Sequence, residues 1–289
     1  MSIRPEAARL LTQISRLLAA RNIRAYIVGG FLRDTLLERN TADIDIGADA
    51  DALEVARYIA ASLNGKYVPL DDINLVGRVV VPGGPWSLDF ATLKGDTIDE
   101  DLAHRDFTID AMAYPLDESI ASGLDPDNII DPFLGRKDLS RRIVKALNGG
   151  VFKADAARLL RAVRIAAELG FDIEAGTEAR ISKDSLLIRR VAGERIREEL
   201  LRLMAVPGAG KRVFEMDRIG LLTAMIPELA PAKGIDQPHA HVWDVFNHSL
   251  QTVGALEYIL RESDWEYGTG EVLSMIPWSY RLERLFVRV

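Results

Sequence analysis

Two aspartates separated by a single residue, Asp43 and Asp45, have the type and spacing that could bind a metal ion. They alternate with isoleucines in the run 41–47, as residues of a β-strand do. Because successive side chains of a strand point to opposite faces, both carboxylates would lie on one face. Neighbouring carboxylates repel each other and need a compensating cation. The pair therefore predicts a site for Mg²⁺, which prefers oxygen ligands and bridges substrate phosphates.

A glycine pair and an arginine precede these aspartates. Gly29 and Gly30 follow the apolar run 25–28, which we expect to be a short buried strand, and Arg33 lies in a predicted helix over 31–38. Glycine lets a backbone approach a phosphate closely, and a helix N-terminus attracts an anion. Arg33 could pair with phosphate oxygens. With the aspartates, this segment predicts a site for a magnesium-bound triphosphate; the alternative is a simple turn beside an edge strand.

Two later segments could complete such a site. Asp89 lies at the centre of a predicted strand over 86–93 and could supply a third carboxylate to a two-metal centre. An exposed strand position explains its spacing nearly as well. Arg105 begins the run 105–114, whose apolar residues fit a packed helix. With Asp106 it could equally form an ordinary surface pair.

Arginines recur at every third position after Asp155, at Arg158, Arg161 and Arg164. On the helix predicted over 155–169 they would occupy neighbouring faces, with apolar residues on the opposite side. Aspartate and arginine can match the hydrogen-bonding edges of bases. We therefore predict contacts with a nucleotide here; the alternative is a solvated basic face.

The elements that would position these residues differ along the chain. Residues 1–136 are expected to form an α/β head with a mixed sheet. The other elements expected there are helices over 5–20 and 51–63 and strands over 66–70 and 75–81. Residues 137–230 show only helical patterns, and 231–289 contains prolines followed by a last predicted helix over 241–260. The predicted fold class is a mixed α/β head followed by all-α domains.

The composition narrows the function classes. The 289 residues include no cysteine, which excludes disulfides and thiolate metal sites and fits a reducing compartment. No apolar run approaches the roughly 18 residues of a membrane span, and the N-terminus lacks the apolar core of a signal peptide. We therefore expect a cytoplasmic protein without membrane contact. The net charge of −7 argues against a simple nucleic-acid binder, although an excess of Lys and Arg over 133–220 could face phosphates or be an ordinary helical surface.

The motifs occur in the order and spacing of one known family. They are Gly29-Gly30-x-x-Arg33-Asp34, Asp43-x-Asp45, Arg105-Asp106-Phe107-Thr108, Asp131-Pro132, Asp155-x-x-Arg158-x-x-Arg161-x-x-Arg164 and Glu194-Arg195-Ile196. Over about residues 20–230 the chain resembles the class II tRNA nucleotidyltransferase and poly(A) polymerase family, which includes the bacterial CCA-adding enzymes. The resemblance implies a head like that of polymerase β, followed by all-α neck and body domains.

The resemblance also implies roles for the candidate residues. Asp43 and Asp45 would bind the catalytic Mg²⁺ ions, and Asp89 would be a third catalytic carboxylate. Asp155 and Arg158 would present a protein template to cytosine or adenine. Nucleotide contacts are implied for Gly29, Gly30, Arg33, Arg105, Asp155, Arg158, Arg161 and Arg164.

The implied reaction adds CMP, AMP or both to the 3′ end of tRNA or another RNA. The terminal hydroxyl would attack the α-phosphate of CTP or ATP, and two metal ions about 3.5–4 Å apart would lower its pKa and stabilise the leaving pyrophosphate. Catalysis would be mostly positioning and charge stabilisation. The alternatives are A-addition of the poly(A) polymerase type and a paralogue that binds nucleotide or RNA without catalysis.

The chain departs from the family pattern at several positions. Asp110 stands where asparagine is usual and adds a negative charge near the site. Ala42 replaces a common lysine, and His104 replaces a common arginine. The usual glutamate, proline and leucine around Asp155 are replaced by Ala154, Ala156 and Ala157. These differences bear on nucleotide selectivity.

Histidines gather near the C-terminal end, at His239, His241 and His248, close to Asp244. They could form a metal cluster, but polar residues at a helix start are the favoured interpretation. The segment also resembles the entry helix of an HD-type phosphohydrolase, so 231–289 could be a truncated HD-like domain. No His-Asp doublet occurs in the sequence, and phosphohydrolase activity is therefore not expected.

Overall fold

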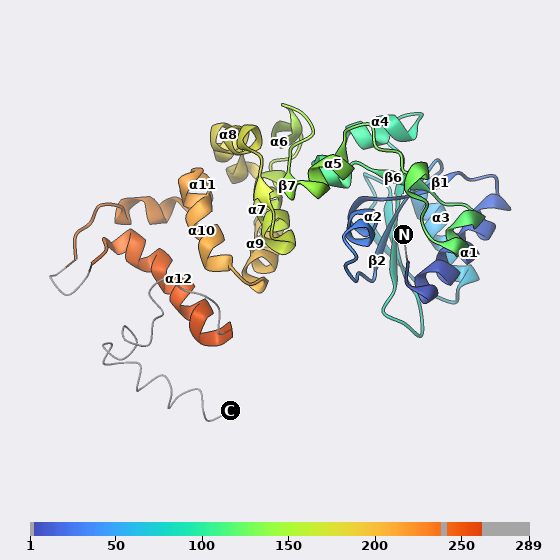
Figure 1. The fold of residues 1–289 in the computed structure, drawn as a ribbon, viewed down its shortest axis with the longest axis horizontal. Helices are drawn as coiled ribbons and strands as arrows, with labels where there is room; N and C mark the ends of the chain where they lie inside the picture. Colours follow the sequence, from blue (N-terminus) through green and yellow to red (C-terminus); the bar gives the residue numbers. More distant parts are fainter. Residues whose placement is uncertain (1–2, 238–241, 262–289) are drawn as a thin grey trace, which may run out of the picture. The chain divides into compact units, whose positions relative to one another are not determined.

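The computed structural model describes residues 3–237 and 242–261, and the chain divides into two compact units (Figure 1). The first unit extends to Val151, and the second begins at Phe152. The first is an α/β head and the second is helical, so the predicted fold class is confirmed. Over the described ranges, no helix combines the length and the apolar character needed to cross a membrane.

A six-stranded mixed sheet forms the centre of the head, with the strand order β3-β4-β5-β2-β1-β6. The strands are β1 (Ala25–Val28), β2 (Asp43–Ala48), β3 (Lys66–Asp71), β4 (Val76–Val80), β5 (Ser87–Thr92) and β6 (Ala113–Pro115). β2 and β5 are parallel, and the other neighbouring pairs are antiparallel. β2 therefore lies inside the sheet, which excludes the alternative that Asp43 and Asp45 flank an edge strand.

Helices, short 3-10 helices and one further strand complete the head. They are α1 (Pro5–Ala19), α2 (Gly29–Leu36), α3 (Ala52–Ser62), α4 (Ile98–Ala103) and α5 (Gly135–Ser140), the 3-10 helices η1 (Thr108–Asp110), η2 (Glu118–Ser122) and η3 (Pro126–Asn128), and the two-residue strand β7 (Ile143–Val144). α1 has a proline in its first turn, where no intrahelical N–H bond is lost, and buries the apolar stripe that contains Leu11 and Ile14.

The alternating pattern of β2 sorts its side chains as predicted. Ile44 and Ile46 are buried, as is Phe90 of β5. α3 packs on this side of the sheet, because a Cβ added to Gly77 of β4, the register partner of Phe90, would lie 2.9 Å from the Cβ of Ala56. The aspartates of β2 and β5 lie on the opposite side.

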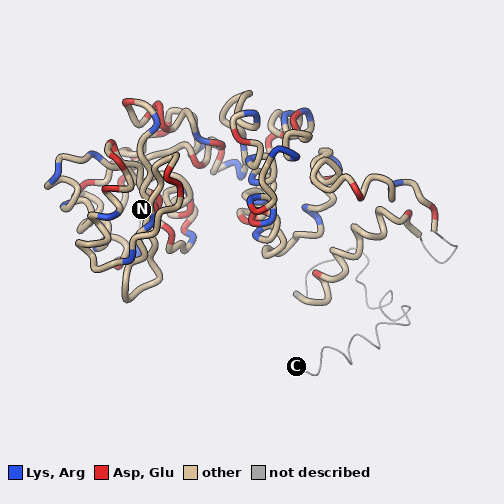
Figure 2. The backbone as a smooth tube through the Cα atoms, turned by 180° about the vertical axis from the view of Figure 1, so that it is seen from behind, with Lys and Arg blue, Asp and Glu red and all other residues tan. Residues whose placement is uncertain are grey.

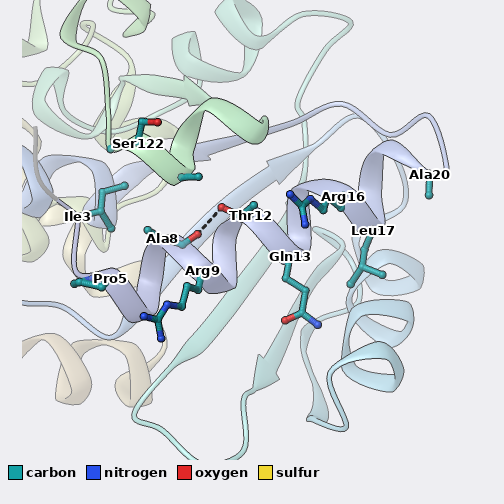
Figure 3. A pocket seen from close by; sticks show the side chains of 12 residues that line it. Ile3, Pro5, Ala8, Arg9, Thr12, Gln13, Arg16, Leu17, Ala20 and Ser122 are labelled. Atoms are coloured by element: carbon teal, nitrogen blue, oxygen red, sulfur yellow. Dashed lines mark hydrogen bonds between the residues drawn. The ribbon is translucent and has the colours of Figure 1, made fainter.

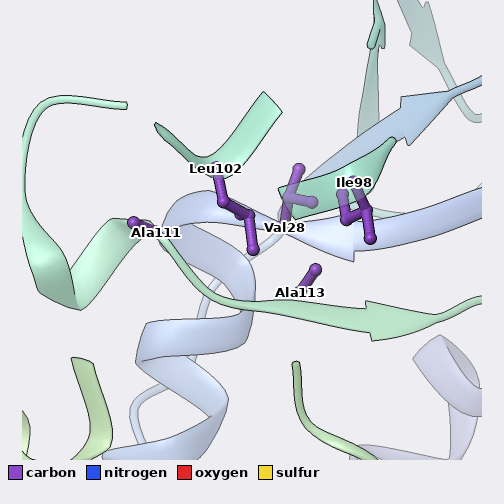
Figure 4. Packing of buried hydrophobic residues seen from close by; sticks show 5 residues of the cluster. All are labelled: Val28, Ile98, Leu102, Ala111 and Ala113. Atoms are coloured by element: carbon purple, nitrogen blue, oxygen red, sulfur yellow. The ribbon is translucent and has the colours of Figure 1, made fainter. Parts of the chain in front are cut away.

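An apolar cluster supports the turn between β1 and α2. Val28, the last residue of β1, packs with Ile98 and Leu102 of α4 and with Ala111 and Ala113 (Figure 4). Full burial of a Val, Leu or Ile side chain contributes about 1.5–3 kcal/mol. The cluster therefore holds the end of β1, and the glycines that follow it, against α4.

The run 105–114 is not a helix, contrary to the prediction. It contains the short turn η1 and then β6, which pairs with β1. Phe107, Ile109 and Tyr114 are each at most 1% exposed. The dense apolar pattern thus reflects a segment that crosses the core, and periodicity alone cannot distinguish this from a buried helix.

α5 belongs to the head by its packing. A Cβ added to Gly135 would lie 2.2 Å from the carbonyl oxygen of Thr108, and the Thr108 hydroxyl donates to Asp138 at 2.7 Å. The first unit accordingly ends at Val151, later than the predicted boundary at residue 136. Helical periodicity indicates that a helix forms there but not which unit it packs against.

The second unit is built from helices. They are α6 (Val151–Ala154), α7 (Arg158–Leu169), α8 (Ala175–Asp184), α9 (Gly193–Ala205), α10 (Ala209–Arg218), α11 (Leu221–Met225) and α12 (Val245–Arg261), with η4 (Ser185–Arg190), η5 (Pro227–Ala232) and the short strand β8 (Asp172–Ile173). Leu159, Val163 and Ala166 of α7 are buried, as predicted from their spacing. Gly170, with a φ of +64°, ends α7 in the left-handed conformation.

α12 packs against α10 through glycines. A Cβ added to Gly210 would lie 2.8 Å from the Cα of Gly254, so a larger residue would separate the helices. Glu257 of α12 accepts hydrogen bonds from the backbone N–H groups of Gly208 and Gly210 at 2.5 and 3.0 Å, which satisfies the N-terminus of α10. The helix predicted over 241–260 is thus observed as α12, which packs within the second unit.

Candidate active site

Three charged side chains form a row across the central strands of the head. Asp45 of β2 is paired in register with Asp89 of β5, and Asp89 is paired with Arg78 of β4. Arg78 donates to both carboxylate oxygens of Asp89, each at 2.7 Å. Register partners lie on the same face of a sheet, so the structure brings Asp89 beside the predicted pair. Arg78 could not be identified from the sequence, because only the strand register shows that it faces Asp89.

The glycine turn touches the carboxylate of Asp45. Gly29 has a φ of +64°, and a Cβ added there would lie 3.1 Å from Asp45 Oδ2 and 3.4 Å from Arg105 Nη1. The backbone N–H groups of Gly30 and Phe31 donate to Asp45 Oδ2 at 3.1 and 3.4 Å. The N-terminus of α2, a carboxylate and a guanidinium therefore meet at one point, where a side chain at position 29 would intrude.

Arg105 reaches this point from the residues that follow α4. Its Nε and Nη2 atoms donate to Asp101 of α4 at 3.1 and 2.8 Å. Asp101 is buried, whereas the Arg105 side chain is 23% exposed. Because α4 is fixed by its apolar contacts with Val28, the ion pair directs a positive charge to the glycine turn. A phosphate group bound at this turn would meet the positive N-terminal end of α2 and the guanidinium.

Asp45 lies in strongly negative surroundings. Burial and the charge of Asp89 raise the pKa of Asp45 to about 6, although Arg105 and the Phe31 N–H act in the opposite direction. The charge of Asp110 makes the smallest contribution to this raised pKa. Burial and negative neighbours thus disfavour the ionised carboxylate, and a cation bound beside Asp45 would relieve this cost.

The donor set fits Mg²⁺ whose coordination is completed by substrate. Asp43 is exposed and accepts a hydrogen bond from the Ser87 hydroxyl. No group of three or more His, Asp and Glu side chains in the described part of the chain converges on a ready metal site. Mg²⁺ commonly takes one or two protein carboxylates and keeps water and phosphate oxygens in its other positions. Asp43 and Asp45 are therefore the residues that would hold it.

Arg33 is turned into the protein. It is 9% exposed and donates to Asp110 at 2.8 Å and to Asp34 at 2.9 Å. Asp110 is the residue that replaces the usual asparagine, so this departure supplies an ionic partner for Arg33. The structure places the Arg33 guanidinium against two carboxylates, and its contact with a triphosphate stays a prediction.

In the second unit, Asp155 is held by an arginine for which the sequence suggested no individual role. Arg195 donates from its two terminal nitrogens to the two oxygens of Asp155, at 3.0 and 2.7 Å, and the Ala157 N–H donates at 3.1 Å. Burial alone would raise the pKa of Asp155, but these hydrogen bonds outweigh it and hold the pKa below its usual value. Asp155 is thus ionised at neutral pH and fixed in direction, as an acceptor for a base edge must be.

The three arginines after Asp155 have different surroundings. Arg161 is exposed and Arg158 is half-buried. Arg164 is 6% exposed and forms ion pairs with Glu168, at 2.5 Å, and with Glu199 of α9. Its guanidinium joins α7 to α9, and its contact with a nucleotide stays a prediction. Lys and Arg recur along the helices of this unit (Figure 2).

A cavity of about 700 Å³ lies elsewhere on the head, beside α1 and η2 (Figure 3). The polar residues that line it include Arg9, Thr12, Gln13, Arg16 and Ser122. None of the predicted site residues lines it, and its lining contains no carboxylate. The cavity is therefore separate from the candidate active site.

The predicted histidine cluster lies only partly within the described residues, because His239 and His241 fall outside them. His248 lies in α12. Asp244, just before this helix, accepts a hydrogen bond from the Asn247 N–H at 2.6 Å. This contact is that of a polar residue at a helix start.

Both parts of this architecture, the mixed-sheet head and the helices that follow it, match known families. Residues 25–145 match the model of the poly A polymerase head domain. Residues 170–233 match the model described as the probable RNA and SrmB-binding site of polymerase A. The chain belongs to the class II tRNA nucleotidyltransferase and poly(A) polymerase family.

Individual relatives agree with this assignment. The chain is 42% identical over 201 residues to a CC-adding tRNA nucleotidyltransferase of Geobacter sulfurreducens, covering 70% of this chain and 45% of that protein. It is 32% identical over 237 residues to an A-adding tRNA nucleotidyltransferase of Deinococcus radiodurans, covering 80% and 52%. Among solved structures, the Thermotoga maritima CCA-adding enzyme complexed with tRNA is 28% identical with a TM-score of 0.72, covering 98% of this chain and 66% of that one. The chain spans about half the length of these curated relatives.

Proposed function

We propose that this chain adds CMP, AMP or both to the 3′ end of tRNA, using CTP and ATP and releasing pyrophosphate. The observation that carries the proposal is the convergence of Asp45, the N-terminus of α2 and Arg105, with Asp43 on the same face of β2. This arrangement combines carboxylates that need a cation with donors that suit a phosphate. Relatives in the same family are named CC-adding and A-adding tRNA nucleotidyltransferases.

Different residues of the head are proposed to bind the metal ion and the triphosphate. Asp43 and Asp45 would hold Mg²⁺, and the N-terminal end of α2 together with Arg105 would hold the triphosphate. When bound, Mg²⁺ supplies the positive charge that favours deprotonation of the attacking 3′-hydroxyl and departure of pyrophosphate. Asp89 adds negative charge beside Asp45 and is the third carboxylate of the site.

The second unit is proposed to select the base. Arg195 fixes the direction of Asp155, which can accept a hydrogen bond from an exocyclic amino group, and Arg158 can donate to a ring or carbonyl acceptor. Cytosine and adenine both carry such an amino group. We further infer a cytoplasmic location, with which a sequence without cysteine is compatible.

Primer extension tests the function. The protein is incubated with Mg²⁺, with CTP or ATP, and with tRNA transcripts that lack the CCA end, lack only its last adenosine, or carry it complete. Incorporation of C, C and A establishes a CCA-adding activity, and C alone a CC-adding one. Incorporation of A alone supports A-addition, and its continuation into a long tail supports the poly(A) alternative.

The matched controls for this assay are two substitutions in the head. Asp43→Ala should abolish incorporation, because it removes a metal ligand. Asp72→Ala removes an exposed carboxylate outside the site and should leave incorporation unchanged. A wild-type protein that binds CTP or ATP but incorporates neither would contradict the proposal and support a non-catalytic paralogue.

A further inference from the structure

Arg78 lies outside every motif discussed above, yet it makes the most complete contact with the carboxylate row. Its guanidinium binds both oxygens of Asp89 at 2.7 Å. The Asp89 side chain is 20% exposed and that of Arg78 is 36% exposed, so this is not a fully solvated surface pair. A two-point contact of this kind fixes the orientation of a carboxylate as well as neutralising its charge.

The register explains what this contact does to Asp89. Neighbouring strands lie about 4.8 Å apart, so Asp89 stands between a like charge, Asp45 of β2, and an opposite charge, Arg78 of β4. Because Arg78 engages both oxygens, it draws the Asp89 carboxylate toward β4. The attraction of Arg78 also extends to Asp43 and Asp45. One guanidinium therefore acts on all three carboxylates of the site.

We propose that Arg78 is a positioning residue of the active site with two separable effects. Its planar guanidinium holds Asp89 in one orientation beside Asp45, which supports turnover. Its charge competes with a metal ion for the carboxylates, so that binding of a divalent ion is weak until nucleotide phosphates complete its coordination. The turnover effect rests on the proposed function, whereas the charge effect depends only on the metal site.

Binding of Mn²⁺ alone, measured from the EPR signal of the free ion, tests the charge effect without turnover. Arg78→Met should tighten Mn²⁺ binding by about ten-fold, because it removes a unit charge within several ångströms of the ligands. The matched control is Arg24→Met, which removes the same charge from an exposed ion pair with Asp49 on the same unit. Equal Mn²⁺ affinities in the two variants would overturn the proposal.

The double variant Arg78→Met/Asp89→Asn distinguishes an effect of charge from misfolding of the single variant. It removes one positive and one negative charge from the row, so its Mn²⁺ affinity should return to within about two-fold of wild type. Thermal melting of each variant verifies folding. A double variant that binds Mn²⁺ as tightly as Arg78→Met would show that Asp89 does not mediate the effect, and would overturn the proposal.

Arg78→Lys separates orientation from charge, because lysine keeps the charge but cannot form the two-point contact. Its Mn²⁺ affinity should stay near that of wild type, whereas kcat for nucleotide addition should fall about ten-fold at unchanged nucleotide KM. Wild-type kcat in this variant would overturn the orienting role. A wild-type protein without any nucleotide addition would contradict the proposed function alone, since the Mn²⁺ measurements would still decide the charge effect.

Discussion

The head and the second unit both combine aspartates with arginines, but their charges are balanced differently. In the second unit, Arg195 binds both oxygens of Asp155, and Arg164 is held by two glutamates. In the head, Arg78 and Arg105 offset only part of the negative charge of the carboxylates, and burial and Asp89 raise the pKa of Asp45 to about 6. Asp155 and Arg164 of the second unit are thus neutralised by their partners, whereas the carboxylates beside Asp45 in the head have a deficit of positive charge.

The difference in charge balance suits the two units to different ligands. A carboxylate that is already paired keeps its orientation and can select a hydrogen-bonding partner by geometry. A carboxylate whose charge is not balanced by a positive neighbour is stabilised most by a bound cation. The head is therefore suited to hold Mg²⁺ with a triphosphate, and the second unit is suited to distinguish bases.

Loss of a metal ligand in the head should reduce activity more than any other substitution. Asp45→Asn keeps the size of the side chain but removes a metal ligand, so nucleotide incorporation should fall at least about a thousand-fold. The measurement is kcat/KM for primer extension at saturating Mg²⁺. Asp155→Asn should retain measurable incorporation, because Asp155 is proposed to select the base and not to bind the metal. Equal losses in the two variants would remove the distinction between the units.

A substitution at the glycine turn should have the next largest effect. Gly29→Ala places a methyl group 3.1 Å from Asp45 Oδ2 at a positive φ, and should lower kcat/KM by about a hundred-fold through misplacement of the triphosphate. Gly83→Ala is the control, since Gly83 also has a positive φ but an added Cβ there meets nothing within 4 Å. Both variants should lose about 1–2 kcal/mol of stability from the left-handed backbone. Comparable activities would show that the turn does not approach the substrate.

Loss of the ion pair between Arg195 and Asp155 should change how the second unit selects a nucleotide. Arg195→Ala should lower the preference for the correct nucleotide over UTP about ten-fold, the value of one charged hydrogen-bonding contact. Incorporation itself should continue. Arg202→Ala removes an exposed arginine that pairs with Glu198 on the same helix, and should leave the preference unchanged. The ratio of kcat/KM values for the two nucleotides distinguishes these outcomes.

The smallest effect concerns stability and pH in the absence of metal. The folded-state pKa of Asp45, about 6, lies above the value of 3.8 for an unperturbed aspartate. Ionisation of Asp45 therefore lowers the free energy of unfolding, and this loss is complete above pH 6. Asp45→Asn should therefore be more stable than wild type at pH 7.5 by about 1–3 kcal/mol, and the difference should shrink as the pH falls toward 4. Urea unfolding in EDTA measures it. A constant difference across this range would show that Asp45 is not destabilised by its surroundings.

The local pattern was sufficient for much of the head and for the helices of the second unit. The alternation of Asp43 to Ile46 predicted an interior-facing and a polar face, and the structure confirms both. The spacing of Leu159 and Val163 predicted the buried face of α7. The run 105–114 was predicted wrongly as a helix. A segment that is buried on all sides has no alternation of apolar and polar residues from which its secondary structure could be predicted. The packing of α5 on the head could not be read from its periodicity either.

The direction of a side chain follows from the repeat of its strand or helix. The amino-acid sequence alone was therefore enough to predict which residues share a face of each element. It therefore identified Asp43, Asp45 and the glycine turn. Only the tertiary structure decided the ionic partners: Arg78 for Asp89, Asp110 for Arg33 and Arg195 for Asp155. These pairs join residues that are between 11 and 77 positions apart in the chain, and strand register and helix packing, which bring them together, leave no periodic signal in the sequence.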